Sequence, residues 1–226
     1  MRHVVILLLV SIGFESLFLH HGINPMDEGW PLHAAMELHG GRILYEEIFW
    51  VFQPGHLLPA WIAYALDPPG IVLARIFYAA FSVALCIGIY FVSRKLMAAR
   101  YALLAGLLVA VAAPTSHLGQ LLFGYRYLIF SVIALLFFHR RLTSDDSRWM
   151  ALAGLFAGIA LYFRLTPAAA VSVGIGIASI SASRDWRRWF EDGFWYVAGL
   201  AVVLVPMLLY FNHSIGLERF WIEWLK

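Results

Sequence analysis

The stretch IFWVFQPGHLLPAWIAYAL, residues 48–66, decides how the rest of the chain is arranged. It is nearly apolar enough to cross a membrane, but Gln53, Pro54, His56 and Pro59 interrupt it. A proline inside a helix removes a backbone hydrogen bond, and the hydrocarbon core of a bilayer has no water to replace that bond. We therefore expect this stretch to lie on the membrane surface rather than to pass through it.

The distribution of positive charge supports this placement. If residues 48–66 lie on the surface, 10 of the 16 Lys and Arg residues fall on the same side as the N-terminus. If residues 48–66 span the membrane, only 6 of the 16 do. Cytoplasmic loops of membrane proteins carry the excess of Lys and Arg. The N-terminus is therefore predicted to be cytoplasmic, and residues 20–70 are predicted to form a loop that faces the periplasm or lumen.

The composition indicates an integral membrane protein. Of the 226 residues, 62% are hydrophobic and 13% are charged, and the mean hydropathy is +0.78. Soluble domains carry about 25% charged residues, so this chain has too little polar surface for water. The net charge of +2 is too small to indicate nucleic-acid binding. The single cysteine, Cys86, excludes an intrachain disulfide.

Seven apolar runs predict an all-α membrane protein with about seven transmembrane helices. A span needs roughly 20 residues, so the shorter runs borrow flanking residues. The first run lacks a small-residue cleavage site and is predicted to be an uncleaved span rather than a signal peptide. We expect residues 1–226 to form a single transmembrane module. The predicted spans lie near residues 4–19, 71–92, 101–118, 121–138, 149–164, 165–183 and 194–212.

The loop over residues 20–70 contains several acids and histidines. Such side chains have few structural roles at a membrane surface, so we expect the chemistry to take place in this loop. Two short helices are expected in it. One covers residues 31–39, with Asp27 as its N-cap and Gly40-Gly41 as its stop. The other runs from about residue 54 to 66 and is expected to lie in the headgroup plane.

The order of these elements resembles the GT-C glycosyltransferases. A first span, Asp-Glu-Gly at residues 27–29 and the run AAMELHGGRILYEEIFWVFQPGHLLPAW (34–61) look like the first outer loop of that class. Protein mannosyltransferases and aminoarabinose or other lipid-linked sugar transferases (glycosyltransferase family 39-like) are the group it is most similar to. Three further runs resemble later spans of the family: ARIFYAAFSVALCIGIYFVSRKL (74–96), LAGLFAGIALYFRLTP (152–167) and VVLVPMLLYFNHSIG (202–216).

The resemblance implies transfer of a sugar from a polyprenyl-phosphate donor to a lipid, glycan or protein acceptor on the outer face of the plasma or inner membrane. It gives Asp27 the role of the catalytic carboxylate, with Glu28 beside it as a second candidate. Arg164, between two apolar runs at the predicted outer surface, takes the role of binding the donor phosphate. Arg126 and His56 are further candidates for contact with that phosphate.

Each of these residues also has a purely structural interpretation. Asp27 can serve only as a helix N-cap, and Glu28 only as its solvated neighbour. Arg164 and Arg126 can anchor the chain at the headgroups. Glu15, near the outer end of the first span, is expected to line a cavity or to pair with an arginine, because an unpaired carboxylate facing lipid is costly.

No cofactor is expected. The loop holds several possible metal ligands, but their spacing matches neither His-x-x-x-His nor the zinc-protease signature His-Glu-x-x-His. No residue is therefore assigned to a metal, although a divalent ion stays an alternative. The histidines concerned are His20, His21, His33, His39 and His56.

Two departures from the family bear on activity. The outer segment 114–120 has no carboxylate, where many relatives carry a second acid. The chain is also much shorter than usual members, and we expect a truncated product, a minimal member or one half of a split enzyme. Two other functions stay open: a lipid or small-molecule transporter, and a non-catalytic membrane assembly subunit. Transporters place ionisable groups near the bilayer midplane, whereas here they gather at the ends of the spans.

Overall fold

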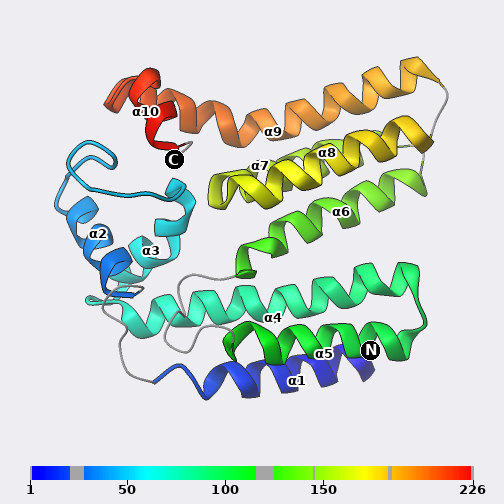
Figure 1. The fold of residues 1–226 in the computed structure, drawn as a ribbon, viewed down its shortest axis with the longest axis horizontal. Helices are drawn as coiled ribbons and strands as arrows, with labels where there is room; N and C mark the ends of the chain where they lie inside the picture. Colours follow the sequence, from blue (N-terminus) through cyan, green and yellow to red (C-terminus); the bar gives the residue numbers. More distant parts are fainter. Residues whose placement is uncertain (1, 21–27, 116–124, 145, 183–184, 225–226) are drawn as a thin grey trace. The chain divides into compact units, whose positions relative to one another are not determined.

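The computed structural model describes residues 2–20, 28–115, 125–144, 146–182 and 185–224. These ranges are helical apart from turns, short connections and an isolated bridge between Leu44 and Ile48. The elements appear in Figure 1 in this order: α1 (Arg2–Ser16), α2 (Trp30–His39), η2 (Pro54–Leu57), α3 (Leu58–Leu66), α4 (Ile71–Leu96), α5 (Ala99–Thr115), η3 (Tyr125–Tyr127), α6 (Leu128–Leu142), α7 (Arg148–Phe163), α8 (Leu165–Ala182), α9 (Trp186–Ser214) and α10 (Leu217–Trp224).

Three helices, α4, α8 and α9, are long and apolar enough to cross a membrane. Four others, α1, α5, α6 and α7, coincide with predicted spans but have 15 to 17 residues. Among the described residues the all-α architecture is confirmed, and each of the seven apolar runs coincides with a helix there. That all seven cross the membrane stays a prediction, because a crossing needs roughly 20 residues.

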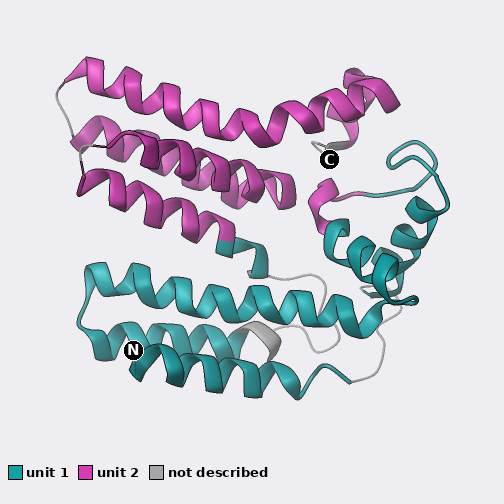
Figure 2. Ribbon diagram, turned by 180° about the vertical axis from the view of Figure 1, so that it is seen from behind, with its two compact units in different colours: residues 1–50, 57–129 teal, residues 51–56, 130–226 magenta. Residues whose placement is uncertain are grey.

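The helices form two compact units, coloured separately in Figure 2. Unit 1 consists of Met1–Trp50 and Leu57–Ile129, and unit 2 consists of Val51–His56 and Phe130–Lys226. The short segment Val51–His56 therefore belongs with the C-terminal helices, although it is flanked on both sides by unit 1.

In unit 1, α1, α4 and α5 lie side by side (Figure 1). Leu7 of α1 is fully buried against Tyr90 of α4 and Ala102 of α5. The short helices α2 and α3 pack on each other, and α3 packs on α4. His39 stacks on Trp61 with ring centroids 5.1 Å apart, which joins the end of α2 to α3.

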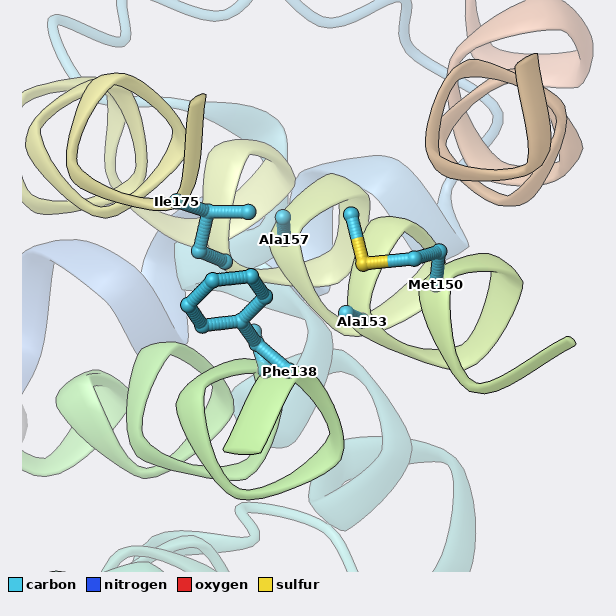
Figure 3. Packing of buried hydrophobic residues seen from close by; sticks show 6 residues of the cluster. Phe138, Met150, Ala153, Ala157 and Ile175 are labelled. Carbon is cyan, nitrogen blue, oxygen red and sulfur yellow. The ribbon is translucent and has the colours of Figure 1, made fainter. Parts of the chain in front are cut away.

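In unit 2, α6, α7 and α8 share an apolar core (Figure 3). Phe138 of α6 contacts Ala153 and Ala157 of α7 and Ile175 of α8, and Met150 closes the cluster. The small side chains of α7 let the neighbouring helices approach closely, which is how membrane helices pack without a hydrophobic driving force between them.

Two glycines bring α7 and α9 into backbone contact. A Cβ placed on Gly154 would collide with the carbonyl oxygen of Tyr196, and one placed on Gly199 would collide with that of Ala151. The contact is reciprocal, because each helix supplies one glycine and one carbonyl. We call these four residues the glycine seam. It fixes the two helices in one register.

Some predicted boundaries differ from the structure. Helix α2 matches the expected helix at 31–39, and its predicted N-cap, Asp27, lies outside the described residues. The predicted surface helix 54–66 is present as η2 followed by α3. Helix α9 begins at Trp186, eight residues before the predicted span, because the Asp185 side chain accepts a hydrogen bond from the Arg187 backbone N–H at 2.9 Å and caps it.

Candidate functional site

The structure brings two of the predicted site residues together in unit 2. The turn η2 carries His56, and Arg164 follows the last residue of α7. Gly55 permits the approach, because a side chain there would overlap the Tyr162 backbone. Two predicted phosphate-binding residues, separated by more than a hundred positions in the sequence, are therefore neighbours at one end of α7.

The His56 imidazole is enclosed. Only 3% of the residue is exposed, and its ring stacks on Phe52 with centroids 5.3 Å apart. Burial, together with the positive charge of Arg164, lowers the pKa of His56 to about 3, although a hydrogen bond with the Phe163 backbone opposes the shift. His56 is therefore neutral at physiological pH. Both of its ring nitrogens are buried, and the ring adds no second positive charge beside Arg164.

Arg164 is exposed at the tight connection between α7 and α8. Its backbone N–H bonds to the Ala160 carbonyl at 2.7 Å, and its own extended conformation ends α7. The preceding Phe163 is buried and stacks on Phe130 with centroids 5.0 Å apart, which anchors the connection in the unit. Within the described ranges Arg164 forms no ion pair, so its guanidinium is available to an external anion.

Glu28 lies in a buried ion pair in unit 1. Its two carboxylate oxygens accept hydrogen bonds from Nε and Nη2 of Arg75, at 2.9 and 2.7 Å. Arg75 also donates from Nη1 to the Leu19 carbonyl at 2.8 Å. Glu28 is fully buried and Arg75 is 4% exposed. This two-pronged arrangement fixes the segment before α2 to the first turns of α4.

Arg126 is also buried, and it points into unit 1. Its Nε donates to the Ser82 hydroxyl at 2.6 Å, and Nη2 lies 3.6 Å from a carboxylate oxygen of Glu15. The expectation that Glu15 pairs with an arginine is thus confirmed. Arg126 holds η3 against α4, and its predicted contact with a donor phosphate stays a prediction.

Asp27, the predicted catalytic carboxylate, lies outside the described residues, as do His21 and most of the segment 114–120. Glu28 directly follows Asp27 in the sequence, and Glu28 is held by its ion pair with Arg75. Among the residues that the structure describes, no three His, Cys, Asp or Glu side chains gather in a way that could hold a metal ion.

Sequence reasoning missed Arg75 as the partner of Glu28. A signal existed: Arg75 is the fifth residue of an apolar helix that is long enough to span. A charge in that position must be paired or must reach the interface, so a partner for Arg75 could have been expected.

The comparisons with known proteins agree with this architecture. The family model described as dolichyl-phosphate-mannose-protein mannosyltransferase matches residues 54–211, more than two thirds of the chain. The chain belongs to this family. The protein is thus an integral membrane protein of the glycosyltransferase type, with the GT-C relationship that the sequence predicted. No curated protein and no solved structure matches the chain.

The matched range divides the candidate residues of this mannosyltransferase-family chain. It begins at the first residue of η2 and ends within α9, and so it includes His56, Arg126 and Arg164. It excludes Asp27 and Glu28. The cluster at the end of α7 therefore lies wholly in the part of the chain that carries the family relationship.

Proposed function

We propose that this protein transfers a sugar from a polyprenyl-phosphate donor to an acceptor at the outer surface of the membrane. The observation that carries the proposal is the neighbourhood of His56 and Arg164. An exposed guanidinium stands beside a neutral imidazole at the end of an apolar helix, in the part of the chain that matches the family. A phosphate carried at the bilayer surface is the anion that suits this position.

The proposed chemistry follows from these groups. The acceptor hydroxyl or amine attacks the anomeric carbon, the bond from that carbon to the phosphate oxygen breaks, and polyprenyl phosphate leaves. Arg164 binds the phosphate through paired N–H groups and stabilises the charge that develops on it. Asp27, assigned by its place in the family motif, accepts the acceptor's proton. Glu28 holds the adjacent backbone through Arg75.

The proposed topology places the N-terminus in the cytoplasm, seven helices across the plasma or inner membrane, and α2 and α3 on the outer face. The support for it is the charge distribution: the predicted cytoplasmic ends hold 10 of the 16 basic residues. The donor would then enter from the bilayer, with its phosphate at the outer surface.

The decisive experiment is a transfer assay on purified protein in liposomes. A panel of polyprenyl-phosphate sugars is supplied, and released polyprenyl phosphate is measured. Arg164→Ala should weaken donor binding about ten- to hundredfold, the range expected for loss of a charge-assisted hydrogen bond. Arg164→Lys should weaken it less, because Lys keeps the charge without the two-pronged geometry.

The matched control is Arg100→Ala, which removes an exposed arginine from the predicted cytoplasmic side. Equal donor affinity in all four proteins would leave Arg164 as a membrane anchor. Movement of labelled lipid across the bilayer without release of polyprenyl phosphate would favour a transporter instead.

Asp27 is tested in the same assay. Asp27→Asn removes the charge and the basicity but keeps an oxygen acceptor. We expect turnover to fall at least about a hundredfold, the low end for a general base. The free energy of unfolding should change by no more than about 1 kcal/mol. Near-normal turnover would remove Asp27 from the chemistry.

A further inference from the structure

Three exposed basic residues lie at one end of unit 1. Arg94 and Lys95 are in the last turn of α4, and Arg2 is the first residue of α1. His3 Nδ1 lies 3.3 Å from the Tyr90 hydroxyl, and this contact holds the first turn of α1 against the end of α4. The start of α5 packs at the same place (Figure 1). We call Arg2, Arg94 and Lys95 the basic end.

The helices that form the basic end supply no carboxylate to neutralise it. The sequence has no Asp or Glu at residues 1–14 or 68–144, so α4 and α5 contain none. The one acid of α1, Glu15, lies in its last turn and faces Arg126. Among the residues that the structure describes, the ion pairs join other side chains than these three. The positive charge of the basic end is therefore open to an external anion.

The arginines at the ends of the helices in unit 2 are in a different situation. Asp146 and Asp185 accept hydrogen bonds from backbone N–H groups in the first turns of α7 and α9. Arg141, near the end of α6, pairs with Asp192 at 2.7 Å. Acids thus accompany the basic residues of unit 2, so the excess of Lys and Arg is not enough to explain the basic end of unit 1.

The basic end lies about one membrane thickness away from the Glu28–Arg75 pair. Arg75 and Arg94 are 19 residues apart on α4, which is about 28 Å at the helical rise of 1.5 Å per residue. The hydrocarbon core of a bilayer is about 30 Å thick. If Arg75 lies near one surface of the bilayer, the basic end lies at the headgroups of the other.

Apolar side chains that face outward border the basic end. Leu96 is 79% exposed, and the exposed residues Tyr101, Leu104 and Leu108 follow on α5. Their spacing of three and four residues puts these three on one face of the helix, along which an acyl chain can lie. Arg100 lies over the Tyr101 ring, 4.7 Å from its centre, and adds its charge to the same end. A phospholipid would use both the charges and this face, whereas a free phosphate would use only the charges.

We infer that the basic end binds the headgroup of an anionic phospholipid whose acyl chain lies along Tyr101, Leu104 and Leu108. Arg and Lys donate charge-assisted hydrogen bonds to phosphate oxygens. The proposed topology places this end at the cytoplasmic leaflet, which carries the anionic lipids. The inference uses no residue that is proposed for sugar transfer, and so it stands independently of that function.

Two photoactivatable phospholipids test the inference on the full chain in phosphatidylcholine liposomes. One has a phosphatidylglycerol headgroup and the other a phosphatidylcholine headgroup, and both carry the same diazirine in the same acyl chain. Labelled peptides are identified by mass spectrometry. Each basic residue near an anionic lipid contributes about fivefold in affinity, so the anionic probe should label residues 101–108 at least about tenfold more strongly. Both probes should label the exposed Val173 and Ile177 of α8 to a similar extent.

Substitutions of charge identify the contact with the headgroup. Arg94→Gln/Lys95→Gln should lower the ratio of anionic to zwitterionic labelling at residues 101–108 at least about fivefold. Arg94→Lys/Lys95→Arg keeps both charges and should keep the ratio. The matched control is Arg148→Gln/Arg187→Gln, which removes two exposed arginines from unit 2 and should leave the ratio unchanged.

Salt supplies a test that needs no substitution. At about 1 M salt the Debye length falls to about 3 Å, so the ratio at residues 101–108 of the unaltered protein should fall as well. The folding of each variant is checked by size-exclusion chromatography and thermal stability.

Equal labelling of residues 101–108 by both probes would overturn the inference, as would an unchanged ratio in folded Arg94→Gln/Lys95→Gln. The same preference for the anionic probe on α8 would also overturn it, because it would show a general attraction of anionic lipid to the protein. Loss of the preference when inorganic phosphate replaces chloride at equal ionic strength would show a site for free phosphate instead of a phospholipid.

Discussion

Gly55 packs on the carbonyl oxygen of Tyr162 so closely that a Cβ added to Gly55 would lie 2.6 Å from it. The atom in the way belongs to the backbone of α7 and cannot rotate aside. This contact seats η2, which carries His56, against the end of α7 that leads into Arg164.

Gly55→Ala should therefore separate His56 from Arg164. We expect the variant to lose about 1–3 kcal/mol of stability, as overpacked sites do, and to lose donor binding together with it. Gly174→Ala is the control, because a Cβ at that position in α8 meets nothing within 4 Å. Unfolding in mixed micelles and donor titration measure the two effects. An alanine variant with normal stability and normal donor affinity would show that the contact is not needed.

The Glu28–Arg75 pair predicts a large and reciprocal effect on stability. Glu28→Leu or Arg75→Leu alone should cost about 3–5 kcal/mol, because each leaves one buried charge without its partner. The double variant should recover most of that loss, since two apolar side chains replace the pair. The pair Glu37–Arg42, whose arginine is exposed, supplies the control, and breaking it should cost about 0–1 kcal/mol.

The same double variant also decides the role of Glu28. If Glu28 only holds the backbone, a folded Glu28→Leu/Arg75→Leu protein should retain measurable sugar transfer. A folded double variant with no turnover would return Glu28 to the catalytic residues.

His56 predicts a dependence of stability on pH. Its folded-state pKa of about 3 lies below the usual value near 6.5, so between these values the unfolded chain binds more protons. Stability should therefore fall as the pH drops below about 6.5. The contribution of His56 should shrink by about 2 kcal/mol between pH 7 and pH 5. His56→Gln should lack this part of the slope, and parallel curves for the two proteins would contradict the burial of a neutral imidazole.

The topology predicts opposite sides for the two ends of α4. After Cys86→Ala, single cysteines are introduced as Asp67→Cys before the helix and Ala98→Cys after it. Both positions are exposed. A membrane-impermeant maleimide applied from outside should label the first and spare the second. If both react from the same side, α4 does not cross the bilayer as proposed.

The helices of this fold could be predicted from sequence because hydropathy and helix length report on the same property, the thickness of the bilayer. The first residue of α9 could not be predicted from hydropathy. Its first turns carry Trp186, Arg187 and Arg188, which suit the membrane–water interface, where a helix is stable without being apolar.

The site was only partly predictable. Charge and position pointed to Arg164 and His56 separately, but the contact between η2 and the end of α7 depends on tertiary packing at Gly55. The Glu28–Arg75 pair joins positions 47 residues apart, and hydropathy contains no information about which buried charge meets which. The rule that buried charges are paired limits the possible partners of Arg75, but only the tertiary structure identifies Glu28 as the partner.

The glycine seam gives the protein a mechanical property. Helix α7, with 16 residues, is about 24 Å long, and α9, with 29, is about 43 Å long. Since the two cannot slide past each other, a bilayer of different thickness must be accommodated by tilting them together. The depth of Arg164 then follows the tilt of its longer neighbour. The thickness of the host membrane thus becomes a variable that sets how far this cation stands from the headgroups.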